Sequence, residues 1–173
     1  MSFFEMLTAK KKSVFDNSFY EFELDLLEGG TINFQTFRGK KVLLVNTAAQ
    51  CGFSSQLYEM ERIYQKYKDN LIVLAVPSNT FMGQEPGNRA HLRKEYREEF
   101  KVTFPITHKL IVKGDGTHPL YRWIENKKLD EKYFAPIKWN FHKYLFNENG
   151  EIIGSFSSSV LPNDRAIISK IEQ

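Results

Sequence analysis

Cys51 is the residue with the clearest chemical potential, because it is the single cysteine of the 173-residue chain and it follows an apolar run. The run covers residues 42–45, and the segment after Cys51 predicts the start of a helix. A thiol at a helix N-terminus faces unpaired backbone N–H groups and the positive end of the helix dipole, and both stabilise the nucleophilic thiolate. Cys51 is therefore a candidate nucleophile. From position alone, a small buried hydrophobic residue is the more common case.

The segments around Cys51 predict the elements that position it. Residues 42–45 and 71–76 are continuous apolar runs, typical of strands buried on both faces of a sheet. Between them, residues 57–67 carry apolar side chains at helical spacing and predict an amphipathic helix. Strand, helix and strand in this order imply a parallel crossover, which places Cys51 at the carboxyl end of a strand, where open α/β sheets hold their sites.

The remaining segments complete an α/β fold. Residues 19–24 and 31–34 alternate apolar and polar side chains around a glycine turn and predict an N-terminal β-hairpin. Further on, the sequence predicts a charged helix over residues 88–100, a third strand over 106–112 and a short helix over 119–126. A second hairpin over residues 140–156 and a terminal helix over 162–171, opened by Pro162, complete the chain. A central mixed sheet flanked by helices, with a cysteine at the first strand-to-helix turn, is the plan of the thioredoxin-like fold.

Composition sets the class of protein. The length fits one domain, residues 1–173, and no apolar run reaches the ~18 residues of a membrane span. The net charge of +3 is spread over interleaved acids and bases, so no nucleic-acid partner is expected. A single cysteine and no apolar leader favour the reducing cytoplasm. The four histidines, His91, His108, His118 and His142, lack ligand spacing, so we expect no metal and no bound cofactor.

Three segments together resemble a known family. Residues 45–56, which surround Cys51, are similar to the peroxidatic motif of the glutathione peroxidase family. Residues 81–87 are similar to its glutamine loop, and residues 137–141 to its Trp-Asn motif, in the same order and spacing. The resemblance covers about residues 19–171. It implies a thiol peroxidase, a cytoplasmic antioxidant enzyme of oxidative stress defence that reduces hydrogen peroxide and organic or lipid hydroperoxides.

By this resemblance Cys51, Gln84, Trp139 and Asn140 form a catalytic tetrad. An ordinary thiol, with a pKa of about 8.5, is only a few per cent ionised near neutral pH. A helix terminus stabilises an anion by ~0.3 to 1 kcal/mol, whereas each hydrogen bond to a charged group contributes ~1.5 to 3 kcal/mol. Two side-chain amides and an indole N–H provide such donors without a competing charge. Taken singly, Gln84 is more typical of a solvated turn, Trp139 of a core and Asn140 of a strand entry or turn.

The chain departs from the family at the positions that often hold a second cysteine. Tyr96 stands at the position of a resolving cysteine, Ser78 at another frequent cysteine position, and Ser54 where thioredoxins keep their second cysteine. Thr80 and Met82 also differ from the usual residues of the glutamine loop. We therefore expect a Cys51 sulfenic acid to be reduced by glutathione or another external thiol, with a thioredoxin-like reductant as the alternative.

The oligomeric state and the alternatives to a peroxidase function are also addressed by the sequence. The short stretch between Trp123 and Trp139 resembles members without a tetramer loop, which indicates a monomer or weak dimer. Two other functions compete with the peroxidase. One is a peroxide sensor or redox relay that passes oxidation from Cys51 to a partner protein, and the other is a structural domain with an inert thiol.

Overall fold

A four-stranded mixed sheet forms the centre of the computed structural model, which describes residues 13–14, 17–127 and 134–173. The strand order is β4-β3-β5-β6. The bounds are β3 Lys41–Thr47, β4 Leu71–Pro77, β5 Lys143–Phe146 and β6 Ile152–Phe156. β3 runs parallel to β4 and antiparallel to β5, and all of its residues are buried, as its apolar sequence predicts.

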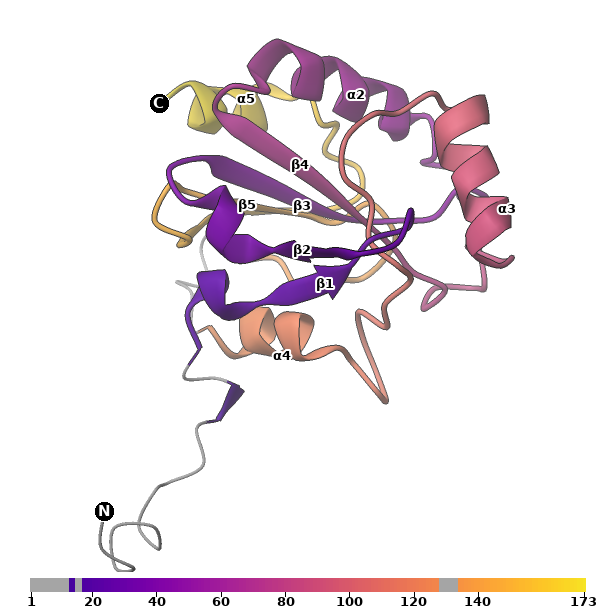
Figure 1. The fold of residues 1–173 in the computed structure, drawn as a ribbon. Helices are drawn as coiled ribbons and strands as arrows, with labels where there is room; N and C mark the ends of the chain where they lie inside the picture. The colour runs from indigo at the N-terminus through magenta and orange to yellow at the C-terminus, as the bar shows by residue number, and fades with distance from the viewer. Residues whose placement is uncertain (1–12, 15–16, 128–133) are drawn as a thin grey trace, which may run out of the picture.

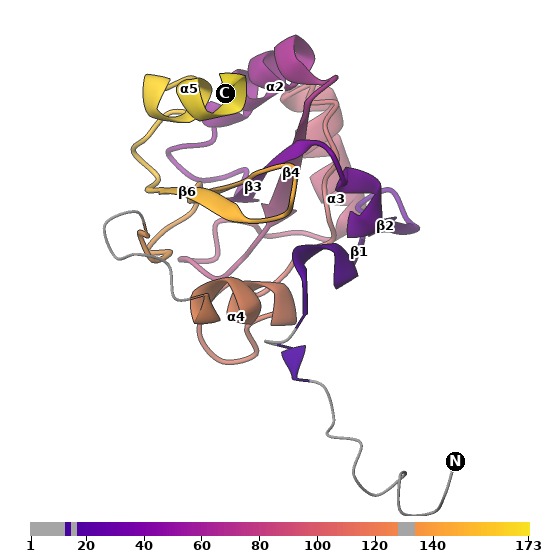
Figure 2. The ribbon, with the colours of Figure 1, turned by 90° about the vertical axis from the view of Figure 1, so that its left-hand side faces the viewer.

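Helices cover both faces of this sheet. α2 (Gln56–Tyr67) and α5 (Arg165–Glu172) lie on one face, and α4 (Pro119–Asn126) lies on the other (Figures 1 and 2). The loop after β4 leads into α3 (Arg89–Arg93) and then into η4 (Lys94–Glu99), a π-helical segment. The predicted helix over residues 88–100 is confirmed as this pair, and the predicted α4 matches the structure at both ends.

Two hydrophobic cores fill the spaces between the sheet and its helices. Side chains alternate along β3, so Leu43 and Val45 enter the α2-side core while Val42 and Leu44 enter the α4-side core. The α2-side core also contains Cys51. The α4-side core is rich in aromatic rings, namely Phe19, Tyr20, Phe22, Phe34, Phe37, Tyr121, Trp123, Tyr144 and Phe146.

The predicted N-terminal hairpin is present as a separate two-stranded sheet of β1 (Glu23–Asp25) and β2 (Thr31–Asn33). The strand expected over residues 19–24 is shorter than predicted, because Phe19–Glu21 forms a 3-10 turn, η2, held by a capping box between Ser18 and Glu21. A second 3-10 turn, η3 (Phe34–Phe37), follows β2 and sends Phe34 and Phe37 into the α4-side core.

Three further predictions are wrong. Residues 106–112 do not form a strand, because Ile106 and Thr107 make only isolated bridges, to Ala75 of β4 and to Leu26 beyond β1. The second hairpin begins at Lys143, because residues 139–141 form a turn. Pro162 lies in a turn, and α5 begins at Arg165 after Asp164, whose carboxylate caps the helix by accepting the Ala166 N–H.

Candidate active site

Cys51 lies in the tight turns that join β3 to α2. Its sulfur accepts a hydrogen bond from the Phe53 N–H at 3.4 Å, and its carbonyl accepts one from the Ser54 N–H at 2.9 Å. α2 begins at Gln56, so the thiol lies in the turns before the helix, and the predicted start of a helix after Cys51 is confirmed. The donor that reaches the sulfur is therefore a turn amide, and the side chain is only 4% exposed.

The glutamine loop is held against the Cys51 loop by two adjacent contacts. The Gln50 N–H donates to the Gln84 carbonyl at 3.1 Å. One residue earlier, the Ala49 N–H donates to both oxygens of the Glu85 carboxylate, each at 3.2 Å. The residue before the thiol is thereby fixed to the backbone of Gln84.

A side-chain contact joins Gln84 to the Trp-Asn segment. The Asn140 Nδ2 donates to Gln84 Oε1 at 3.0 Å, and Asn140 is fully buried. Because the Gln84 oxygen is engaged, its amide NH₂ is the group left to donate to an anion. Asn140 Oδ1 is buried and has no hydrogen-bond partner within the described ranges.

Trp139 is held by its backbone and by ring contacts. The Asn46 Nδ2, from β3, donates to the Trp139 carbonyl at 3.1 Å. The Trp139 ring is half-buried against the α2-side core and lies 5.6 Å from the ring of Phe81, centroid to centroid. Its indole N–H donates to no residue that the structure describes, and it is thus open to a bound oxygen atom.

Phe141 closes the turn in a left-handed backbone conformation, with φ of 62°. An aromatic residue rarely adopts this conformation, so neighbouring contacts must hold it. The Phe141 N–H donates to the Asn46 carbonyl at 2.6 Å, and the Lys143 Nζ donates to the Phe141 carbonyl at 2.6 Å. Lys143 is fully buried, and burial lowers its pKa to about 7.

The structure thus brings three of the four predicted residues into one region, with Gln84 and Asn140 in direct contact and Trp139 adjacent in sequence. Cys51 shares the α2-side core with Trp139, but in the part of the chain that the structure describes its sulfur accepts no hydrogen bond from Gln84, Trp139 or Asn140. Sequence reasoning missed Asn46, Glu85 and Lys143. A signal existed for Asn46, a polar residue that interrupts the apolar strand β3.

His118 and His142 each have a local hydrogen-bond partner. His118 Nδ1 accepts the Leu120 N–H at the start of α4, and His142 is hydrogen-bonded to Ser155. Burial lowers the pKa of His142 to about 4. Among the described residues, no group of three or more His, Cys, Asp or Glu side chains is placed to hold a metal ion.

Comparison with known proteins gives consistent matches. The family model for glutathione peroxidase matches residues 19–125. The chain is 38% identical over 145 residues to the glutathione peroxidase-like peroxiredoxin GPX5 of Chlamydomonas reinhardtii, covering 83% of this chain and 89% of the relative. It is 37% identical over 148 residues to a probable phospholipid hydroperoxide glutathione peroxidase of Solanum lycopersicum, covering 84% and 86%.

A solved structure agrees with the sequence matches. The crystal structure of T. cruzi GPX1 superposes with a TM-score of 0.67 at 30% identity, covering 89% of this chain and 93% of that one. The predicted thioredoxin-like fold is thereby confirmed. Within the described ranges, no helix has the length and apolar character that crossing a membrane requires.

Proposed function

The chain belongs to the glutathione peroxidase family, and we propose that within it Cys51 is the peroxidatic nucleophile, assisted by Gln84, Trp139 and Asn140. As a member of this family the protein is an oxidoreductase that reduces hydroperoxides with electrons from thiols. The roles of the four residues and the order of the steps are as follows.

The first step is attack of the Cys51 thiolate on one oxygen of the hydroperoxide. A sulfur–oxygen bond forms, the oxygen–oxygen bond breaks, and the leaving alkoxide takes a proton to give an alcohol, or water when the substrate is hydrogen peroxide. Cys51 becomes a sulfenic acid. The Gln84 NH₂ and the Trp139 indole N–H are donors for the leaving oxygen, while Asn140 orients the Gln84 amide.

Two thiol molecules complete the cycle. The first attacks the sulfenic sulfur, which gives a mixed disulfide at Cys51 and releases water. The second attacks the mixed disulfide, which releases the oxidised thiol and returns Cys51 to its reduced form. No second cysteine exists in the chain. Ser78 and Tyr96 are both fully buried and neither can form a disulfide, so the reductant is external, with glutathione as our first choice.

The contact that best supports this proposal is the hydrogen bond between Asn140 and Gln84, which joins two segments 56 residues apart beside the Cys51 loop. The substrate class is wider than hydrogen peroxide. A relative is named for phospholipid hydroperoxide, and the mouth of the glutamine loop carries Met82, which is 80% exposed and offers an apolar contact for an acyl chain. We assign the enzyme to oxidative stress defence.

The test is stoichiometric oxidation followed by reduction. One equivalent of hydrogen peroxide should add one oxygen to Cys51, detected by mass and by a sulfenate-trapping reagent. Glutathione should then add as a mixed disulfide, and a second equivalent should restore the thiol. Efficient turnover with thioredoxin and none with glutathione would show that thioredoxin, and not glutathione, is the reductant. Absence of any Cys51 oxidation, with turnover intact, would overturn the assignment of the nucleophile.

A second function, a peroxide relay, is favoured by the single cysteine. Because the sulfenic acid has no partner thiol in the chain, it is available to a thiol on another protein. A relay would show slow turnover with glutathione and rapid formation of a mixed disulfide with a protein partner. An inert thiol, the third possibility, would show alkylation of Cys51 no faster than that of a free cysteine at every pH.

We also propose a cytoplasmic monomer or weak dimer. The single reactive thiol fits a reducing compartment. The segment that suggested the assembly state includes residues 128–133, which lie outside the described residues. Sedimentation analysis over a range of protein concentrations would decide the assembly state, and a stable tetramer would contradict it.

A further inference from the structure

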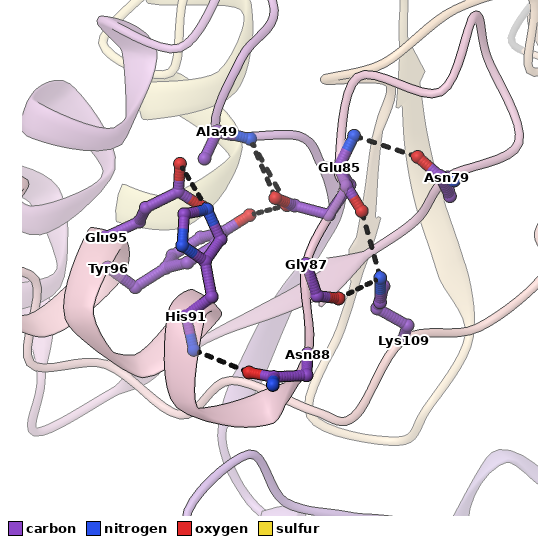
Figure 3. Close-up of polar contacts among 9 residues, drawn as sticks. All are labelled: Ala49, Asn79, Glu85, Gly87, Asn88, His91, Glu95, Tyr96 and Lys109. Atoms are coloured by element: carbon purple, nitrogen blue, oxygen red, sulfur yellow. Dashed lines mark hydrogen bonds and ion pairs between the residues drawn. The ribbon is translucent and has the colours of Figure 1, made fainter.

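A buried carboxylate, Glu85, directly follows Gln84 in the chain and contacts Ala49 and Tyr96 (Figure 3). Its side chain is fully buried and accepts hydrogen bonds from the Ala49 N–H and from the Tyr96 hydroxyl. Its own N–H donates to Asn79 Oδ1 at 3.0 Å, and its carbonyl accepts from Lys109 Nζ at 3.0 Å. Every polar group of this residue therefore has a partner, which is the arrangement that a buried charge requires.

The contact with Tyr96 continues to the strand that precedes Cys51. The Tyr96 hydroxyl lies 2.7 Å from Thr47 Oγ1, and either oxygen can be the donor. Tyr96 comes from the π-helical segment η4 and is fully buried. The chain from Thr47 through Tyr96 to Glu85 thus connects the end of β3, η4 and the glutamine loop.

This chain of hydroxyls can serve Glu85 in both of its protonation states. When the carboxylate is ionised, Tyr96 donates to it and can accept from Thr47. When it is protonated, its O–H can donate to the Tyr96 oxygen, and the Tyr96 proton turns toward Thr47. A buried hydroxyl pair of this kind lets the carboxyl group gain or lose a proton without losing its partner.

The charges around Glu85 are few. Burial raises the pKa of Glu85 from 4.5 to about 7, against the hydrogen bonds from Tyr96 and Ala49, with Glu95 raising it further and Lys109 lowering it. Glu95, on η4, is itself paired with His91 of α3, with 3.3 Å between His91 Nε2 and Glu95 Oε1. The Lys109 ammonium bonds to the Glu85 and Gly87 carbonyls.

We propose that Glu85 and Tyr96 are positioning residues for the peroxidase reaction, and that their buried hydrogen bonds set the place of the Cys51 loop relative to Gln84. This deepens the proposed function and rests on it. The Ala49 N–H, which Glu85 holds, is two residues before the nucleophile, and Glu85 itself directly follows Gln84. The two contacts at Ala49 and Gln50 act as a clamp between the two loops.

The clamp matters because displacement of reacting groups is costly. A shift of ~1 Å between a nucleophile and its partners can slow a reaction by roughly 100-fold. If Glu85 loses its acceptor oxygens, the Ala49 N–H and the Tyr96 O–H lose a buried partner, and only the Gln50 N–H still holds the Cys51 loop to Gln84, so the loop can shift. Neither Glu85 nor Tyr96 needs to touch the substrate for this effect.

The test compares two replacements of Glu85 of similar volume. Glu85→Gln keeps an acceptor for Ala49, and its NH₂ can donate to Tyr96, so it reproduces the protonated arrangement. Glu85→Leu fills the space and removes the hydrogen bonds of the side chain to Ala49 and Tyr96, while the backbone contacts of residue 85 remain. The second-order rate of Cys51 oxidation by hydrogen peroxide should fall by roughly 10- to 100-fold in Glu85→Leu and stay within about threefold of the wild type in Glu85→Gln.

Tyr96→Phe breaks the chain at its middle and provides an independent variant if Glu85→Leu does not fold. Its oxidation rate should fall by about 3- to 10-fold. The matched control is Tyr121→Phe, because Tyr121 is also fully buried but its hydroxyl has no hydrogen-bond partner within the described ranges. Tyr121→Phe should keep the wild-type rate.

A spectroscopic measurement separates positioning from general stability. The Ala49 amide resonance should titrate with a midpoint near pH 7 in the wild type, because its acceptor is Glu85. In Glu85→Gln the titration should vanish. In Tyr96→Phe the midpoint should rise, because the Tyr96 hydrogen bond lowers the pKa of Glu85. Tyr121→Phe should leave the midpoint unchanged.

Two results would overturn the proposal: wild-type oxidation rates in folded Glu85→Leu or in Tyr96→Phe, or equal losses in the Leu and Gln variants. Failure of the proposed function has a different signature. If Cys51 were not the nucleophile, turnover would survive Cys51→Ser, while the Ala49 titration would still report the contact with Glu85.

Discussion

The two faces of the central sheet differ in what their buried residues do. On the α4 side, aromatic rings pack against one another, for example Phe19 stacked on Phe146 with 4.2 Å between centroids. On the α2 side, the core is more aliphatic and contains Cys51, and the buried Glu85 carboxylate contacts Ala49 and Tyr96 of this core. Apolar side chains need no hydrogen-bond partner when they are buried, whereas buried polar groups destabilise the fold unless each is paired. The proposed nucleophile and the buried carboxylate of Glu85 therefore lie on the α2 side, whereas the α4 side holds most of the aromatic packing.

Cys51→Ser should have the largest effect on activity. A hydroxyl is nearly isosteric with the thiol but hardly ionises near neutral pH, so peroxide consumption should fall to background. Thermal unfolding should stay close to the wild type, because the substitution removes no large apolar group. If the Ser variant consumed peroxide at a rate near that of the wild type, Cys51 would not be the nucleophile, and the reaction would not take place on the α2 side.

Phe146→Ala tests the opposite face. Phe146 is fully buried and contacts Phe19 and Trp123, so its truncation should lower the free energy of unfolding by about 3 to 5 kcal/mol. Where the variant is still folded, its peroxidase rate should remain within about twofold of the wild type. Denaturant unfolding measures the free energy of unfolding of the variant and of the wild type. A rate loss of tenfold or more in the folded variant would contradict the division between the faces.

Glu85 should make stability depend on pH. Because its pKa rises from 4.5 to about 7 on folding, the native state binds more protons than the unfolded state between these values. Its contribution to stability is therefore present at low pH and lost as the pH rises through 7, by up to about 3 kcal/mol. Glu85→Gln should lack this loss, so its stability relative to the wild type should increase from pH 4.5 to 8. If the free energies of unfolding of the two proteins differed by the same amount at every pH, burial would not raise the pKa of Glu85.

Gln84→Ala and Trp139→Phe should have the smallest effects of this series. Each removes one donor beside the thiol and should slow peroxide oxidation of Cys51 by roughly 10- to 100-fold, or ~1.4 to 2.7 kcal/mol. Rapid-mixing measurements with reduced enzyme would give the rates. If both variants react as fast as the wild type, the amide and the indole have no part in the mechanism.

Much of the fold could be predicted because the signals are local. Apolar runs gave β3 and β4, helical spacing gave α2, and Pro119 marked the first residue of α4. Residues 106–112 have a strand-like sequence, but their hydrogen bonds alternate between β4 and the end of the hairpin, so no continuous ladder forms. Which of these two segments each residue bonds to depends on the tertiary fold, so it cannot be predicted from the sequence of residues 106–112.

The site was predicted less completely for the same reason. The four resemblance-based residues lie in three segments that the fold brings together, but the partners of Glu85 and Tyr96 lie 36 and 49 residues away in the chain. The sequence marks Tyr96 only as a tyrosine at the position of a resolving cysteine. Its hydroxyl contacts depend on the π-helical turn of η4, which no periodicity in the sequence indicates.

The contacts of the Trp-Asn turn also bear on how the protein reaches its folded state. Asn46 and Trp139 are 93 residues apart, and the left-handed turn at Phe141 is held by Asn46 and Lys143. Contacts of such long sequence separation form slowly, because a large loop must close first. We therefore expect this turn to be completed only after β3 and β5 have paired. In refolding, recovery of peroxidase activity should lag behind burial of the aromatic side chains, and simultaneous recovery would argue against a late turn. A newly made chain would then carry an unprotected thiol until its last long-range contacts close.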